Sequence, residues 1–195
     1  MSISSVKTGA IGVSLLAGNA YYLPSDYESI ATVSVGSGGT STISFTSIPS
    51  TFSHLQLRYF GHLQGNGFDF ALTNVTFNND SGSNYAYHRL YGSGSSASAD
   101  GASSQTKFYS TWTPDNLSQA NSFGSAVIDI LDYANTNKYK TARILGGFDL
   151  NGSGYVALFS GLWQSTSAIN RIDIVSNSGQ SFSNYSHFAL YGIKA

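Results

Sequence analysis

The acidic residues are the first candidates for chemistry, because a pair of carboxylates can act as general acid and base. Asp129 and Asp132 lie three residues apart at the end of an apolar stretch. Residues three apart on a β-strand point to opposite faces, so this spacing separates the two carboxylates. The apolar surroundings of Asp129 favour a turn contact or an arginine partner over a catalytic role.

A glycine-rich stretch loosely resembles a calcium-binding loop. Asp149-Leu150-Asn151-Gly152-Ser153-Gly154 places oxygen-bearing side chains at alternate positions, as a calcium-binding loop does. The twelfth position is Ser160 instead of a bidentate glutamate, and a glycine occupies the fourth position. We therefore interpret the stretch as a hairpin turn and expect neither a metal ion nor a cofactor.

Other motifs of catalysis are incomplete. Gly92-Ser93-Gly94-Ser95-Ser96 lacks the strand-to-helix context of a hydrolase nucleophile. Gly36-Ser37-Gly38-Gly39 joins two alternating segments, whereas a dinucleotide-binding loop joins a strand to a helix. None of the four histidines has the spacing of a metal site; they are His54, His62, His88 and His187. The sequence predicts a protein that is not an enzyme.

The composition points instead to contact with other surfaces. Only 10% of the residues are charged, against about a quarter in an ordinary soluble domain. The net charge is −1 without a Lys/Arg cluster, and no run of apolar residues is long enough for a transmembrane helix, so neither nucleic acid nor a membrane is expected as partner. The 13 tyrosines suit protein interfaces and sugar stacking alike. Trp112 and Trp163 are interpreted as core anchors in preference to sugar platforms.

These residues must be positioned by β-strands, since apolar residues alternate with polar ones from Ser29 onward and Asn/Asp/Gly turns follow at short intervals. We predict a hairpin of 30–35 and 40–45 around the turn at 36–39, and short helical turns near 95–103 and 115–120. The further predicted strands are 55–60, 70–77, 85–91, 107–113, 125–131, 141–148, 155–163, 168–175 and 187–193. Many short antiparallel strands predict an all-β fold, a two-sheet antiparallel jelly-roll-like sandwich with an N-terminal extended arm.

The predicted arm is residues 1–27, and the sandwich domain is 28–195. The arm has no clean period, is apolar and is interrupted by glycines. Lys7 before the apolar stretch 10–17 resembles a signal peptide, but a single Lys is a weak basic region and we expect no cleavage. We expect an assembly contact through Ile11, Val13, Leu15, Leu16, Tyr21, Tyr22 and Leu23. In the alternative, the segment is a terminal strand and loop of the domain's own core.

Several segments together carry a family resemblance over about 28–194. They include the stretches Ile43-Ser44-Phe45-Thr46-Ser47-Ile48-Pro49, Phe77-Asn78-Asn79-Asp80-Ser81-Gly82-Ser83-Asn84-Tyr85, Ile128-Asp129-Ile130-Leu131-Asp132-Tyr133, Ser160-Gly161-Leu162-Trp163 and Ser186-His187-Phe188-Ala189-Leu190-Tyr191-Gly192-Ile193. On these residues the chain resembles a widespread group of bacteriophage virion proteins, especially of tailed phages of marine and freshwater bacteria. The resemblance implies a β-sandwich module on the virion exterior and supplies no catalytic residues.

The expected function is therefore that of a non-enzymatic virion structural protein. We favour a head-decoration (cement) subunit on the particle exterior, docked through its N-terminal arm. The alternatives are a tail, fibre or receptor-binding module for host attachment and, in a different class, a carbohydrate-binding lectin-like domain. The expected partners are the major capsid protein or tail proteins and further copies of the chain in a homo-oligomer. The lectin alternative adds a host surface glycan.

Overall fold

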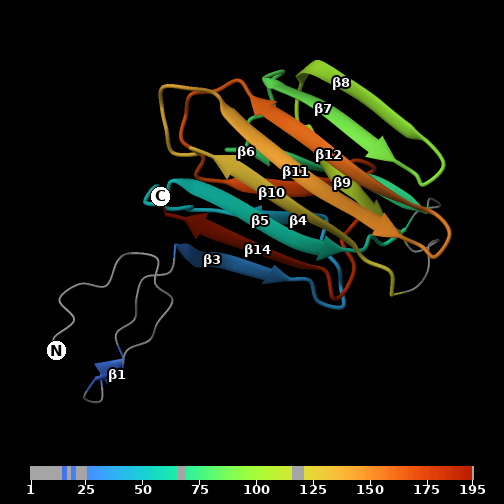
Figure 1. Ribbon diagram of the computed structural model, residues 1–195, viewed down its shortest axis with the longest axis horizontal. Helices are drawn as coiled ribbons and strands as arrows, with labels where there is room; N and C mark the ends of the chain where they lie inside the picture. Colours follow the sequence, from blue (N-terminus) through green and yellow to red (C-terminus); the bar gives the residue numbers. More distant parts are fainter. Residues whose placement is uncertain (1–14, 17–18, 21–25, 66–68, 116–120, 195) are drawn as a thin grey trace, which may run out of the picture.

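The computed structural model of the chain describes residues 15–16, 19–20, 26–65, 69–115 and 121–194 (Figure 1). These residues contain β-strands and no helix, so no helix among them could cross a membrane. The strands are β1 Leu15–Leu16, β2 Asn19–Ala20, β3 Tyr27–Ser34, β4 Thr42–Phe45, β5 His54–Gly61, β6 Phe70–Phe77, β7 Tyr85–Gly92, β8 Ala97–Gln105, β9 Phe108–Pro114, β10 Gly124–Leu131, β11 Lys140–Asp149, β12 Gly154–Trp163, β13 Ile172–Ser176 and β14 His187–Ile193.

Strands β3 to β14 form two antiparallel sheets that pack face to face. The large sheet has eight strands in the order β3-β14-β5-β10-β11-β12-β7-β8, and the small sheet has four in the order β4-β13-β6-β9. In Figure 1 the large sheet lies in front and the small sheet behind it. Strands β3-β14-β5-β10 opposite β4-β13-β6-β9 follow the winding of a jelly roll, and the β11–β12 and β7–β8 hairpins extend the large sheet beyond β10. The predicted all-β sandwich is confirmed.

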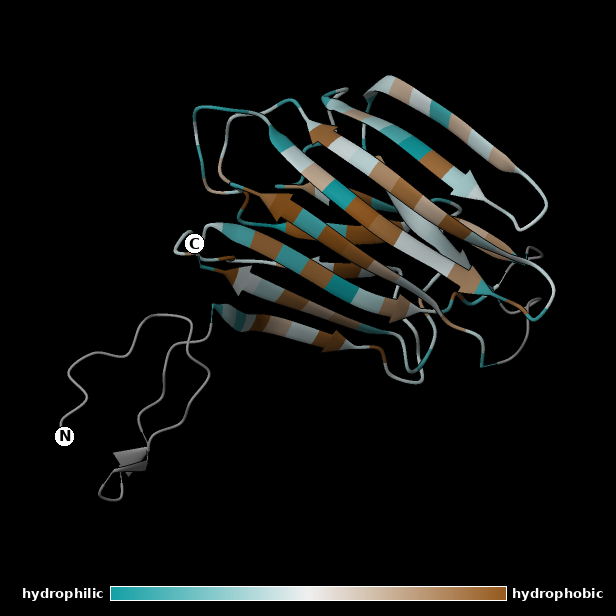
Figure 2. Cartoon of the chain, in the orientation of Figure 1, coloured by the Kyte–Doolittle hydropathy of each residue, from teal (hydrophilic) through white to brown (hydrophobic). Residues whose placement is uncertain are grey.

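The core lies between the sheets and follows from the alternation along each strand. In β11, Ala142, Ile144 and Phe148 are buried, while their neighbours Arg143 and Leu145 are exposed. Figure 2 shows the same alternation of hydrophobic and hydrophilic residues along the long strands of the large sheet. The small sheet contributes its own apolar side chains to the core, among them Ile43, Phe45, Val75, Phe77, Ile172 and Ile174.

The predicted hairpin of 30–35 and 40–45 is wrong. Gly36 to Gly39 do form a turn, closed by the Gly39 N–H on the Gly36 carbonyl at 3.0 Å. The strands on its two sides do not pair, because β3 joins β14 in the large sheet and β4 joins β13 in the small one. The turn therefore carries the chain from one sheet to the other. Alternation shows which residues face the core, but it does not show which strand is the neighbour.

The predicted helical turn near 95–103 is also wrong, since this stretch belongs to β8. Among the described strands, β8 is the last of the large sheet and pairs with β7 alone. Its residues are exposed on both faces, apart from the half-buried Ala102 and Gln105. Because neither face enters the core, the strand shows no apolar alternation that could have marked it. Of the helical turn predicted at 115–120, only Asp115 is described, and it forms a bridge with Leu63.

Candidate interaction surface

Most of the residues predicted to make the assembly contact lie outside the described part of the chain. Leu15 and Leu16 form β1, which pairs with β2 in a two-stranded antiparallel ribbon. The others that lie outside are Ile11, Val13, Tyr21, Tyr22 and Leu23. The assembly role of residues 1–27, and the domain boundary after them, stay predictions.

The two candidate carboxylates are engaged with different neighbours. Asp129 accepts hydrogen bonds from Gln56 Nε2 at 2.7 Å and from Arg143 at 3.0 Å, so an arginine is its partner as predicted. Asp132 follows the end of β10 and forms an ion pair with Lys138. The hydrogen bond from Lys138, followed by the charges of Lys138 and His54, holds the pKa of Asp132 below its usual value. The structure does not bring these carboxylates together.

Residues 149–154 form the tight turn between β11 and β12, as interpreted from the sequence. The Leu150 N–H donates to the Ser153 carbonyl at 2.7 Å, and the Asn151 N–H donates to Asp149 Oδ1 at 2.7 Å. Asn151 has a φ of 57° and Gly152 one of 132°, which their residue types tolerate. Within the described residues, no group of three His, Cys, Asp or Glu side chains could hold a metal ion.

The histidines occupy separate environments. His54 Nδ1 accepts a hydrogen bond from the Asp132 N–H at 3.0 Å, and His88 is exposed on the large sheet. His187 stacks on Phe60 with ring centroids 5.5 Å apart. His62 is buried, and this burial lowers its pKa despite the opposing attraction of Asp115.

Both tryptophans are core residues, as predicted. Trp163 is 2% exposed, and its Nε1 donates to Asp80 Oδ2 at 2.7 Å. Trp112, in strand β9 of the small sheet, is 8% exposed, and its ring packs against Arg89 of β7 in the large sheet. Neither indole can therefore act as an exposed platform for a sugar ring.

Arg89 is enclosed by aromatic rings at the β7 end of the sandwich. Its Cζ lies 4.9 Å from the ring centroid of Trp112, 5.0 Å from Tyr91 and 5.4 Å from Tyr109. Its guanidinium also makes a two-pronged contact with Asp100 of β8, with Nε–Oδ1 and Nη2–Oδ2 distances of 2.8 Å. A ring cluster of this kind could bind an external cation. Here the chain's own arginine fills it, so these aromatic residues are structural.

The outer face of the large sheet carries a row of aliphatic side chains, one from each of four adjacent strands. We call these the apolar row. Leu145 lies directly opposite Val127 on one side and Leu158 on the other, and Leu158 lies opposite Leu90. Leu90 and Leu145 are each 57% exposed and Leu158 is 48% exposed. Within the described residues, the three leucines are thus exposed to solvent, whereas Val127 is half-buried.

A shallow groove of about 610 Å³ runs beside the apolar row, over β14, β5, β10, β11 and β12. The groove forms because, in a second row of cross-strand neighbours, small residues lie between large ones. Ser125 lies opposite Gly147 and Phe60, while Val156 lies opposite Gly147. A Cβ at Gly147 would lie 2.3 Å from the Tyr155 carbonyl oxygen, so only glycine fits there. The fold itself therefore keeps the groove open.

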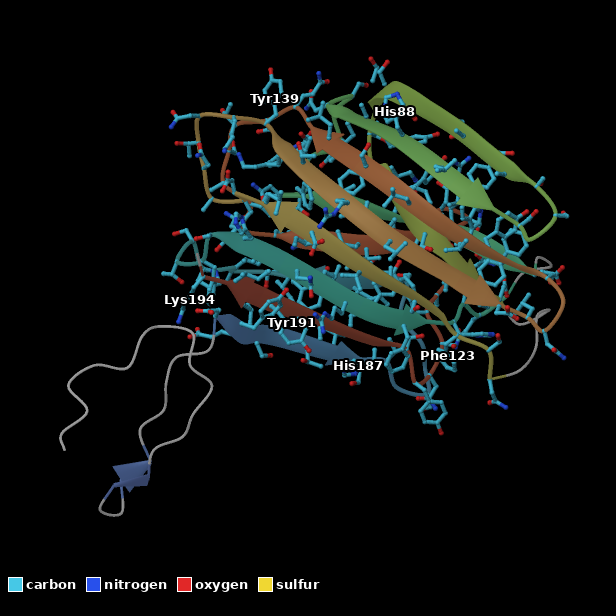
Figure 3. All side chains as sticks on the ribbon, in the orientation of Figure 1. His88, Phe123, Tyr139, His187, Tyr191 and Lys194 are labelled. Atoms are coloured by element: carbon cyan, nitrogen blue, oxygen red, sulfur yellow. The ribbon has the colours of Figure 1, made fainter. Side chains whose placement is uncertain are left out.

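One end of the groove is rimmed by aromatic and charged side chains. His187 and Tyr191 stand on β14 on this face of the sheet (Figure 3). The guanidinium of Arg58 lies 5.7 Å from the ring centroids of both Tyr27 and Tyr191. Arg58 donates a hydrogen bond to Gln56, and Gln56 donates one to Asp129, which also forms an ion pair with Arg143. We call Gln56, Asp129 and Arg143 the polar row; it lies next to the apolar row.

The apolar row could have been predicted from unbroken apolar runs in the sequence, which the search for alternating strands does not consider. Ile144-Leu145 in β11 and Val156-Ala157-Leu158-Phe159 in β12 are unbroken apolar runs. Since successive residues of a strand point to opposite faces, every second residue of such a run must leave the core of a two-sheet sandwich.

Comparison of the chain with protein-family models, curated proteins and solved structures gives no match.

Proposed function

We propose that the chain is a non-enzymatic structural subunit of a bacteriophage virion and that it docks on neighbouring virion proteins through the outer face of the large sheet. The apolar row is the observation that carries the docking role. Burying an aliphatic side chain contributes up to about 1.5–3 kcal/mol before the costs of association. Four such side chains with an adjoining groove can hold a subunit on a neighbour without charge.

The virion assignment rests on the resemblance of the sequence over about 28–194. The partners of the titratable residues support a role without catalysis. Asp129 is bound by Gln56 and Arg143, Asp132 by Lys138, and Arg89 by Asp100. Each of these groups is engaged with a side chain of the same chain and is not aimed into the groove as a nucleophile or base would be.

Within the virion we favour a head-decoration subunit on the particle exterior, with a tail, fibre or receptor-binding module as the alternative. Attachment through the aliphatic side chains of the apolar row suits docking on a lattice of identical neighbours, because such attachment depends little on salt. Residues 1–27 are proposed to add a second contact through their apolar side chains.

The test uses particles of the encoding phage produced without this chain, to which purified full-length protein is added. Wild-type protein should sediment with the particles. The double variant Leu145→Ser/Leu158→Ser should lose most of this binding, and so should Ser125→Phe, which fills the groove from the solvent side. Arg143→Ser, on the same face but in the polar row, is the matched control and should bind as the wild type does.

Two outcomes would overturn the proposal. Wild-type protein that does not associate with either heads or tails would remove the virion role. Binding that is unchanged in both outer-face variants would remove the docking surface. Separate binding to isolated heads and isolated tails decides between the decoration subunit and the tail module. A variant without residues 1–27 tests the arm.

The aromatic rim favours a second candidate, a glycan-binding module. Tyr27 is 41% exposed and stands beside Tyr191, next to the hydrogen-bonding side chains of the polar row. Exposed rings beside polar groups can stack on and bind a sugar, with affinities of roughly micromolar to millimolar. Saturable binding on a host-glycan array, abolished by Tyr191→Ala and retained by Leu145→Ser, would establish this function.

A further inference from the structure

Among the described strands, β8 ends the large sheet at one edge, and a β-bulge near its C-terminal end leaves residues 97–102 in a regular ladder with β7. Natural edge strands are protected by Lys or Pro residues, by β-bulges, by shortness or by inward charges. The bulge of β8 lies outside the stretch 97–101. β8 is 9 residues long with the sequence ASADGASSQ, which contains neither Lys nor Pro. Its only charge, Asp100, is neutralised by Arg89 of the neighbouring strand. The edge is thus a long template of small residues.

The hairpin register shows which backbone groups of β8 point away from the sheet. The Ser93 N–H donates to the Ser96 carbonyl at 3.0 Å, which closes the β7–β8 turn. Hydrogen-bonded and non-hydrogen-bonded pairs alternate from there along an antiparallel ladder. With the register Gly92↔Ala97, this places the N–H and C=O groups of Ala97, Ala99 and Gly101 on the open side.

We propose that this edge pairs with β8 of a second copy of the chain, antiparallel about a two-fold axis at Ala99. Ala99 then faces Ala99 of the second copy, and Ala97 faces its Gly101. The three outward pairs exchange about six backbone hydrogen bonds and join two large sheets into one continuous sheet. Such an interface is isologous, as in most homodimers.

The side chains of β8 select this register over its neighbours. In the proposed register Asp100 faces Ser98 of the second copy, whose hydroxyl can donate to the carboxylate. Moving the axis to Asp100 would place two carboxylates directly opposite each other, which is destabilising. Moving it to Ser98 would pair Ala97 with Ala99 and leave Gly101 opposite the turn at 93–96.

The same pairing extends the apolar row across the seam. Ala99 lies opposite Leu90, so it continues the row to the edge of the sheet. A two-fold axis at Ala99 joins the rows of the two copies into one apolar band. This dimer is independent of the virion assignment, because it forms between purified chains. Its failure would leave the docking proposal standing.

The absence of cysteine from the natural sequence allows a direct test of the register. In a hydrogen-bonded antiparallel pair the two Cα atoms are about 5.5 Å apart, within the range of a disulfide. Full-length Ala99→Cys should therefore form a covalent dimer under mild oxidation. Ala97→Cys should not, because its two copies would lie about 13 Å apart along the strands. Thr32→Cys, on the opposite edge strand β3, is the control for random collision.

Sedimentation equilibrium tests the interface without a cross-link. Wild-type protein should be a dimer, and Ala99→Lys should raise the dissociation constant about tenfold or more by placing like charges opposite each other. Thr32→Lys adds the same charge to an exposed position on the other edge of the sheet and should leave the constant unchanged. A monomeric wild type would overturn the proposal. So would a dimer that tolerates Ala99→Lys, or cross-linking that is equal at residues 97 and 99.

Discussion

The two faces of the large sheet carry similar aliphatic side chains but differ in what covers them. Ile144 and Phe159 point inward and are fully buried against the small sheet, whereas their chain neighbours Leu145 and Leu158 point outward and remain about half exposed. The inner residues stabilise the fold by leaving water. The outer ones are only partly covered by the described chain, so the apolar surface that remains is available for a partner. Hydropathy alone does not separate the two roles, but position on the sheet does.

The largest expected effect comes from truncating the inner face. Ile144→Ala should lower the free energy of unfolding by about 2–5 kcal/mol, because it removes buried methyl groups and leaves a cavity. Leu145→Ala, one residue along, should change it by less than about 0.5 kcal/mol. Urea unfolding of the two variants measures both values. Comparable losses would contradict the comparison and would mean that the outer face is also packed in the isolated protein.

The comparison becomes sharper with two arginines of the same sheet. The Arg89 side chain is 14% exposed among aromatic rings, whereas the Arg143 side chain is 73% exposed. Arg89→Ala should cost about 1–3 kcal/mol, since it empties the ring cluster and leaves Asp100 without its partner. Arg143→Ala should cost at most about 1 kcal/mol, as expected for an exposed ion pair. Equal thermal stabilities of the two variants would show that the ring cluster contributes nothing.

A buried and an exposed histidine allow the same comparison through the pH dependence of stability, where we expect the smallest effect. Burial lowers the pKa of His62 below its ordinary value of 6.5. The unfolded chain therefore takes up a proton at His62 before the folded chain does, and stability falls as pH decreases through about 6.5 toward the folded pKa. His62→Asn should reduce this loss of stability between pH 7 and pH 5. His88→Asn, at an exposed position on the outer face, should keep it. Chemical unfolding across this pH range distinguishes them.

Much of the fold could be read from the residues because core-facing strands alternate. The prediction for 125–131 matches β10 closely, where Ala126, Ile128 and Ile130 point inward. The arginine partner of Asp129 and the turn at 149–154 also followed from local chemistry. β8 could not be found in the same way, since its Ala, Ser and Gly residues have no buried face. Its strand conformation comes from pairing with β7.

The outer surface was predictable only in part. Val156-Ala157-Leu158-Phe159 implies that some aliphatic residues must leave the core, yet it does not say what lies beside them. Leu158 becomes the neighbour of Leu90, and Leu145 that of Val127, because β11 and β12 lie between β10 and β7. The groove likewise depends on Ser125, Gly147 and Phe60 meeting from three strands.

The sequence by itself determined the all-β class, the inward face of most strands and the shortage of groups for catalysis, because these depend on residue type and on a period of two along one strand. The tertiary structure alone decided that β3 and β4 lie in different sheets, that Arg89 fills its ring cluster and that four aliphatic residues form one row. Each of these depends on which strands become neighbours. That choice is made by packing of the whole sandwich, between residues far apart in the chain.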